Sequence, residues 1–145
     1  MENPNLPKIL LVMDDDVDES QVRHILVKYR FANGLQRMRR AREAVRLFND
    51  LKGRDGAPTG DIPQLIIFSQ SDAGSTPPAS AFAAFRNETG NTPIIFVASS
   101  REEEENIRAL NLPRTYCLGK PLGFFKLLEA MQKLGMYWMV LEAPP

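Results

Sequence analysis

Short apolar runs alternate along this chain with stretches in which apolar residues recur every three or four positions. Continuous apolar runs bounded by polar residues are typical of strands buried on both faces, whereas the longer spacing is typical of helices. The sequence predicts strands at 8–13, 35–38, 64–68, 93–98 and 115–118, each followed by a helical segment. This alternation predicts right-handed crossovers and an α/β fold whose parallel sheet has helices on both faces.

Polar residues follow several of these predicted strands, and in a parallel sheet the functional crevice lies beyond the carboxyl ends of the strands. The residues at those ends are Asp14 and Asp15, Ser69, Ala98 and Ser99, and Lys120 followed by Pro121. We expect any functional site to be built from this set.

The composition is that of an ordinary globular domain, with 145 residues, 43% of them hydrophobic and 25% charged. The single cysteine, Cys117, excludes an intrachain disulfide. Eighteen basic residues balance eighteen acidic ones, so no global field attracts nucleic acid or a membrane surface. The longest apolar run, 9–13, is too short to span a bilayer, and we expect a cytoplasmic protein.

Four segments, KILLVMDDD, PQLIIFS, TPIIFVAS and YCLGKPL, resemble in order and spacing the receiver domain of bacterial response regulators. The ending MYWMVLEAPP is similar to that of small stand-alone regulators associated with bacterial phytochromes. The resemblance implies a flavodoxin-like, five-stranded parallel sheet of order 2-1-3-4-5 and a role in a two-component phosphorelay. It also implies a receiver-like domain at 1–135 and an apolar tail at 136–145.

The family's chemistry depends on an aspartate that accepts a phosphoryl group, a hydroxyl residue and an aromatic switch residue. This chain has Ser69 at the acceptor position, Ala98 followed by Ser99 at the hydroxyl position, and Cys117 preceded by Tyr116 at the switch position. A serine hydroxyl needs an adjacent base, whereas a carboxylate attacks without one. We therefore predict a degenerate receiver (a pseudo-receiver) that is not an enzyme and acts as a protein–protein interaction module.

The alternative is a working receiver that accepts phosphate on Asp72, or on Asp14 or Asp15, with Mg²⁺. Asp14 and Asp15 stand near the positions whose acids hold Mg²⁺ in the family, and they could hold the ion weakly. These acids could equally be a solvated turn that favours the N-terminus of the next helix, where Asp18 is a plausible cap or first-turn acid. No cofactor is otherwise expected.

Lys120 and Pro121 match the family's lysine–proline pair. A partly buried ammonium needs a partner, and we expect Lys120 to pair with Asp14 or Asp15 across the crevice. Ser99 or Ser100 is expected to cap the helix that follows, and Cys117 to be a small buried apolar residue.

Two charged runs are predicted to be solvated helix starts. The basic run is opposed in sequence only by Glu43 and comprises Arg37, Arg39, Arg40, Arg42 and Arg46. It could instead bind an acidic surface or nucleic acid, but it lacks interleaved aromatic residues. The acidic run, 102–105, cannot converge on one metal ion because consecutive helix residues point in different directions.

The tail is the most apolar segment outside the predicted elements, and Tyr137, Trp138 and Met139 are candidate interface residues. Packing against its own domain would also cover this tail, but the resemblance implies a homodimer. The partner would be a signalling protein, either a histidine kinase or a downstream regulator, and no membrane partner is expected.

Overall fold

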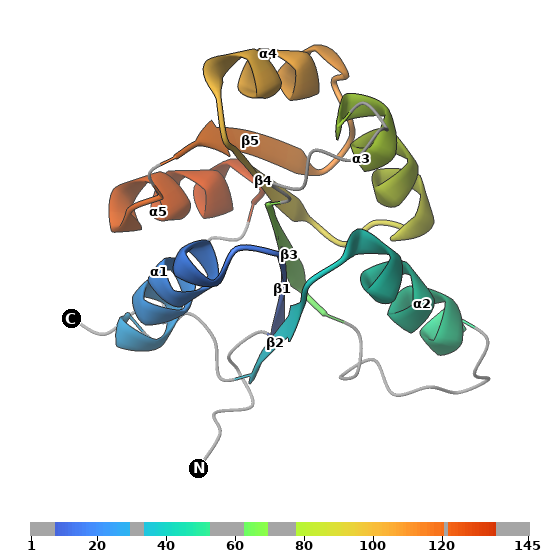
Figure 1. Cartoon of the computed structure of the whole chain (residues 1–145), viewed down its shortest axis with the longest axis horizontal. Helices are drawn as coiled ribbons and strands as arrows, with labels where there is room; N and C mark the ends of the chain where they lie inside the picture. The colour runs from blue at the N-terminus through green and yellow to red at the C-terminus, as the bar shows by residue number, and fades with distance from the viewer. Residues whose placement is uncertain (1–7, 30–33, 53–62, 70–77, 121, 136–145) are drawn as a thin grey trace.

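The computed structural model describes residues 8–29, 34–52, 63–69, 78–120 and 122–135. Within them, strands and helices alternate as the hydrophobic pattern predicts (Figure 1). The elements are β1 (Lys8–Met13), α1 (Asp16–Lys28), β2 (Gly34–Met38), α2 (Ala41–Lys52), β3 (Leu65–Ser69), α3 (Pro78–Glu88), β4 (Ile94–Ala98), α4 (Arg101–Ala109), β5 (Thr115–Gly119) and α5 (Phe124–Lys133).

All neighbouring strands are parallel and their order is β2-β1-β3-β4-β5, so the predicted fold class is confirmed. The observed strand boundaries match those predicted for β1 and differ by at most one residue at either end of the other strands. Among the described helices, none has the length and apolar character needed to cross a bilayer.

The sheet separates two apolar cores, because successive side chains of a strand point to opposite faces. In β1, Leu11 faces α1 and α5, whereas Leu10 faces α2, α3 and α4. The same division of the helices is visible in Figure 1. Both core residues are fully buried, which explains why β1 is a continuous apolar run rather than an alternating one.

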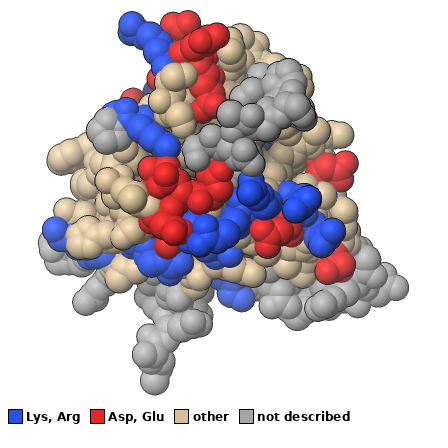
Figure 2. Space-filling view, in the orientation of Figure 1, with Lys and Arg blue, Asp and Glu red and all other residues tan. Residues whose placement is uncertain are grey.

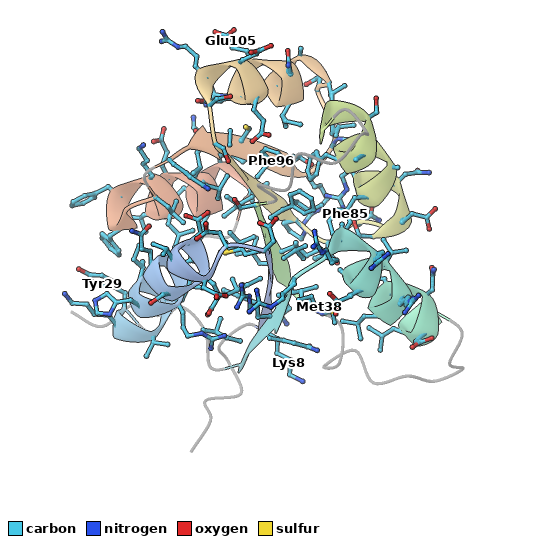
Figure 3. The ribbon with its side chains drawn as sticks, in the orientation of Figure 1. Lys8, Tyr29, Met38, Phe85, Phe96 and Glu105 are labelled. Atoms are coloured by element: carbon cyan, nitrogen blue, oxygen red, sulfur yellow. The ribbon has the colours of Figure 1, made fainter. Side chains whose placement is uncertain are left out.

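Aromatic rings fill the core under α3. Phe68, at the centre, lies 4.9 to 5.4 Å between ring centroids from Phe82, Phe85 and Phe96. Phe85 and Phe96 lie between the sheet and α3 (Figure 3). This packing fixes the carboxyl half of β3 and therefore the position of Ser69, its last residue.

A buried arginine joins the end of α3 to the loop before β5. Arg86 is only 4% exposed, and its guanidinium donates hydrogen bonds to the carbonyl oxygens of Gly90, Pro113 and Arg114. Burial, together with the nearby charge of Arg114, lowers the pKa of the Arg86 guanidinium. The three carbonyls compensate much of the cost of burying this cation.

We predict that Arg86→Ala lowers the free energy of unfolding by about 2–3 kcal/mol, because a buried side chain is removed and three carbonyl oxygens lose their charged donor. Chemical denaturation followed by circular dichroism measures the change. Arg42→Ala is the matched control, because Arg42 lies exposed on α2. An equal, small effect of both substitutions would contradict this role of Arg86.

Candidate functional site

The carboxyl edge of the sheet is uncharged where three strands end. Ser69 ends β3, Met13 lies beside it at the end of β1, and Ala98 ends β4. All three side chains are buried, with exposures of 2% or less. The three central strands of this edge therefore end in a serine and two apolar residues.

The carboxylate of Asp15 is hydrogen-bonded to the backbone of α1. Its Oδ1 atom accepts hydrogen bonds from the N–H groups of Val17, at 2.8 Å, and Asp18, at 3.0 Å. Asp15 is thus the N-cap, and Asp18 belongs to the first turn of the helix. A carboxylate in this position satisfies helix donors that otherwise lack partners and interacts favourably with the helix dipole.

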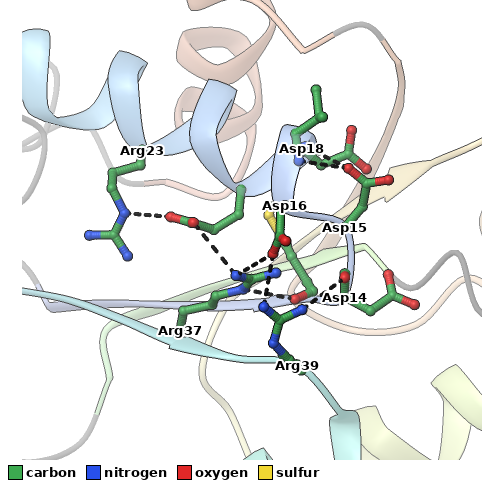
Figure 4. Close-up of polar contacts among 10 residues, drawn as sticks. Asp14, Asp15, Asp16, Asp18, Arg23, Arg37 and Arg39 are labelled. Carbon is green, nitrogen blue, oxygen red and sulfur yellow. Dashed lines mark hydrogen bonds and ion pairs between the residues drawn. The ribbon is translucent and has the colours of Figure 1, made fainter.

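Two arginines neutralise the next acid, Asp16 (Figure 4). Arg37 lies on β2, and Arg39 follows the end of that strand. Asp16 Oδ1 lies 2.8 Å from Arg37 Nη1 and 3.0 Å from Arg39 Nη2. These two guanidiniums lower the pKa of the Asp16 carboxyl, the hydrogen bond from Arg37 being the main cause. Arg37 also donates from Nε to the carbonyl oxygen of Met13, at 3.1 Å, so it ties α1 and the end of β1 to β2.

The partner of Lys120 is Asp18, so the expectation of Asp14 or Asp15 was wrong. The ammonium of Lys120 contacts Oδ2 of Asp18, and both side chains are mostly buried. The carboxylate of Asp15 is already hydrogen-bonded as the helix cap. Asp18, in the first turn of the helix, is the acid that reaches the lysine after β5. The first turn of α1 is consequently held from two sides, by Arg37 of β2 and by Lys120 after β5.

Three of the acids near the end of β1 already have partners within the chain. Mg²⁺ needs several hard oxygen ligands in near-octahedral geometry. Of the acids near the end of β1, Asp15 caps the helix, and Asp16 and Asp18 already pair with cations of this chain. Within the described ranges, no three acidic, histidine or cysteine side chains are grouped as metal ligands would be.

The two residues at the switch position of β5 lie on opposite faces of the sheet. Cys117 is buried in the core under α2, α3 and α4, whereas Tyr116 packs against the other core. Burial, with a contribution from the nearby Glu104 carboxylate, raises the pKa of the Cys117 thiol to about 12. The thiol is therefore protonated at neutral pH and poorly nucleophilic.

The helix after β4 is capped by Ser100, the second of the two serines predicted as its cap. Ser100 Oγ accepts from the N–H of Glu103 at 3.1 Å, and Glu103 Oε1 accepts from the N–H of Ser99 at 2.9 Å. This reciprocal pair fixes the start of α4.

The prediction that the basic run is a single solvated helix start was wrong. Arg37 lies on β2, is mostly buried and pairs with acids of α1, whereas Arg40, Arg42 and Arg46 are exposed. In Figure 2 acidic side chains gather near the middle of the visible face, with basic side chains directly beside them. The carboxyl edge therefore has compensated rather than single-sign charge.

Some predicted site residues lie outside the part of the chain that the structure describes. They are Pro121, Asp72, Tyr137, Trp138 and Met139. Glu102 to Glu105 do begin α4, as predicted.

No protein-family model and no curated protein matches the sequence. Solved structures do match it. The chain has the receiver fold. The bacteriophytochrome response regulator AtBRR is 26% identical with a TM-score of 0.69, over 92% of this chain and 95% of that one. The bacteriophytochrome response regulator RtBRR is 24% identical with a TM-score of 0.71, over 97% and 84%.

More distant signalling proteins share the same receiver fold. The chemotaxis protein CheY4 of Vibrio cholerae is 24% identical with a TM-score of 0.56, over 89% of this chain and 98% of that one. The structural neighbours of this chain are thus receiver domains, including those of response regulators.

Sequence reasoning missed the roles of Arg37 and Asp18. Strand alternation could have indicated Arg37, because it shares a face with Leu35, which packs against the core that includes α1. For Asp18, the signal is helical spacing: the cap at Asp15 uses one carboxylate and leaves the acid three residues later facing the sheet edge.

We predict that Asp16→Asn lowers the midpoint of chemical denaturation at pH 7. The pKa of Asp16 is lowered in the folded state, so its stabilising contribution is present above the ordinary value of 3.8 and is lost as the pH falls through the folded value. The difference between wild type and variant should therefore disappear in acid.

The matched control is Glu102→Gln, on the exposed start of α4, which should change the midpoint little at either pH. A wild-type advantage over Asp16→Asn that persisted well below pH 3.8 would contradict the ion-pair account.

Proposed function

We propose that this chain is a degenerate receiver domain that acts in two-component-type signal transduction as a phosphorylation-independent protein–protein interaction module. The observation that carries the proposal is Ser69, a buried serine at the end of β3 in a chain with the receiver fold. The module is not an enzyme in this proposal.

The chemistry of serine supports the loss of phosphotransfer. A serine hydroxyl becomes an effective nucleophile only beside a general base, and the usual base is histidine. The sole histidine of the chain, His24, is exposed in the middle of α1, away from the strand ends. Ala98, at the end of β4, offers no hydroxyl to a phosphoryl oxygen.

The charges around the crevice also support a module whose shape does not depend on a bound ion. Arg37 forms an ion pair with Asp16, and Lys120 forms one with Asp18. The negative charge of these two acids in the first turn of α1 is therefore neutralised by the chain itself. Charge-assisted hydrogen bonds of this kind are short and directional. They position α1 against β2 and β5 without a metal or a phosphoryl group.

The partner in this proposal is a signalling protein, either a histidine kinase or a downstream regulator. Two of the solved structures with this fold are bacteriophytochrome response regulators, which favours a partner in such a pathway. We also propose that the chain forms a homodimer in which Tyr137, Trp138 and Met139 contribute to the interface.

Incubation with acetyl phosphate and Mg²⁺, followed by intact-mass measurement, tests the loss of phosphotransfer. We predict no gain of a phosphoryl group, because the end of β3 has no carboxylate. A gain that is lost in hydroxylamine would support the alternative, a functional phosphoacceptor. The acceptor residue would then be identified by substituting each candidate in turn. The substitution that abolishes the gain, whether Asp72→Asn, Asp14→Asn or Asp15→Asn, marks the acceptor.

Light scattering of the full chain tests the dimer. We predict that the combined substitution of Tyr137, Trp138 and Met139 by serine converts a dimer to a monomer, because it removes the apolar surface of the tail. Phe125→Ser is the matched control, since Phe125 is an 80% exposed aromatic residue on α5. Dissociation by the control alone would place the interface on α5 instead.

A further inference from the structure

Two cationic side chains close the outer edge of the sheet at β5. This strand pairs only with β4, so its alternate carbonyls point away from the sheet. Arg108 Nη2 of α4 donates to the carbonyl oxygen of Cys117 at 3.0 Å, and Lys126 Nζ of α5 donates to that of Gly119 at 3.2 Å. Each flanking helix thus supplies one donor to edge carbonyls that would otherwise lack a protein partner.

The direction of these carbonyls follows from the pairing of the strand. The N–H of Lys120 donates to the carbonyl of Ala98, and the N–H of Ile94 donates to that of Arg114. Even-numbered residues of β5 therefore bond to β4, and odd-numbered ones, including Cys117 and Gly119, face outward.

A carboxylate of α4 fills the space beside the end of β5. Glu104 Oε2 lies 2.7 Å from Arg108 Nη2, so the acid orients the arginine that closes the edge. Glu104 also packs closely over Gly119, because a Cβ atom at position 119 would lie only 3.0 Å from Glu104 Oε1. The thiol of Cys117 lies 3.8 Å from the carbonyl oxygen of Glu104, which adds a further contact between α4 and β5.

These five residues, Glu104, Arg108, Cys117, Gly119 and Lys126, form what we call the α4–β5 clasp. We infer that the clasp holds α4, β5 and the start of α5 as one unit, in a conformation that does not depend on the Lys120–Asp18 pair. The four contacts described above involve no side chain of the crevice, and the five residues come from these three elements. The surface formed by α4 and β5 then keeps one shape whatever the state of the crevice.

This inference deepens the proposed function, because an interaction module that is independent of phosphate needs a fixed surface. It depends on different contacts, and the two can fail separately. A chain that accepted phosphate could still have an intact clasp, and a chain that accepts none could have a mobile one.

Amide hydrogen exchange of the full chain, resolved by residue with NMR, tests the clasp. Arg108→Ala removes both the ion pair with Glu104 and the hydrogen bond to Cys117. We expect exchange of the Tyr116 and Leu118 amides, which pair with β4, to become about five- to tenfold faster. Amides of β1 and β3 should change less than about twofold, because the clasp does not touch those strands.

Two further variants provide controls on the same elements. Arg101→Ala, at the exposed start of α4, should leave exchange in β5 unchanged. Lys126→Ala removes only the bond to Gly119, and it keeps the test available if Arg108→Ala fails to fold. We expect Lys126→Ala to accelerate exchange locally, at the end of β5 and the first turn of α5.

Independence from the crevice is tested by Asp18→Asn, which removes the partner of Lys120. Exchange should accelerate in the first turn of α1 and stay within about twofold of wild type in α4 and β5. Faster exchange of α4 and β5 in Asp18→Asn would overturn the inference. So would an equal acceleration of β1 and β3 in Arg108→Ala, or unchanged β5 exchange in both clasp variants.

Discussion

The ion pairs at the first turn of α1 are the interactions on which the carboxyl edge of this protein depends. Acids cluster there because a helix N-terminus favours negative charge, and the central strand ends that face them are uncharged. Arg37 and Lys120 therefore form their ion pairs with acids of α1. The result is an edge whose charges compensate one another within the chain.

The rest of the fold presents this edge in a fixed geometry. Two apolar cores hold the sheet between its helices, and the aromatic cluster around Phe68 fixes the strand that ends at Ser69. The receiver fold therefore depends on these apolar cores rather than on the residues at the strand ends. This agrees with the general observation that a fold and the chemistry on it are separable.

The fold was predictable from sequence because burial on both faces leaves continuous apolar runs such as 9–13 and 65–68, which few other structures produce. The placement of Ser69, Ala98 and Cys117 followed from counting along those runs. The pairing of Lys120 was not predictable, because it depends on which acid caps the helix and which one is left facing β5.

Arg37 shows a second reason for the limits of sequence reasoning. Arg39 and Arg40 follow it closely in sequence, and this pattern predicts a surface run, whereas strand alternation directs Arg37 towards α1. Long-range pairs of this kind join residues more than twenty positions apart, and local charge patterns do not reveal them.

The central claim that we propose is that Arg37 and Lys120, by pairing with Asp16 and Asp18, hold the carboxyl edge in one shape without a metal ion or a phosphoryl group. Titration of the labelled protein with Mg²⁺ and beryllofluoride, followed by the amide signals of Ser69, Ala98 and Lys120, tests this claim most directly. We predict no saturable shift of these three signals. Saturable shifts at all three, at millimolar Mg²⁺, would contradict the account.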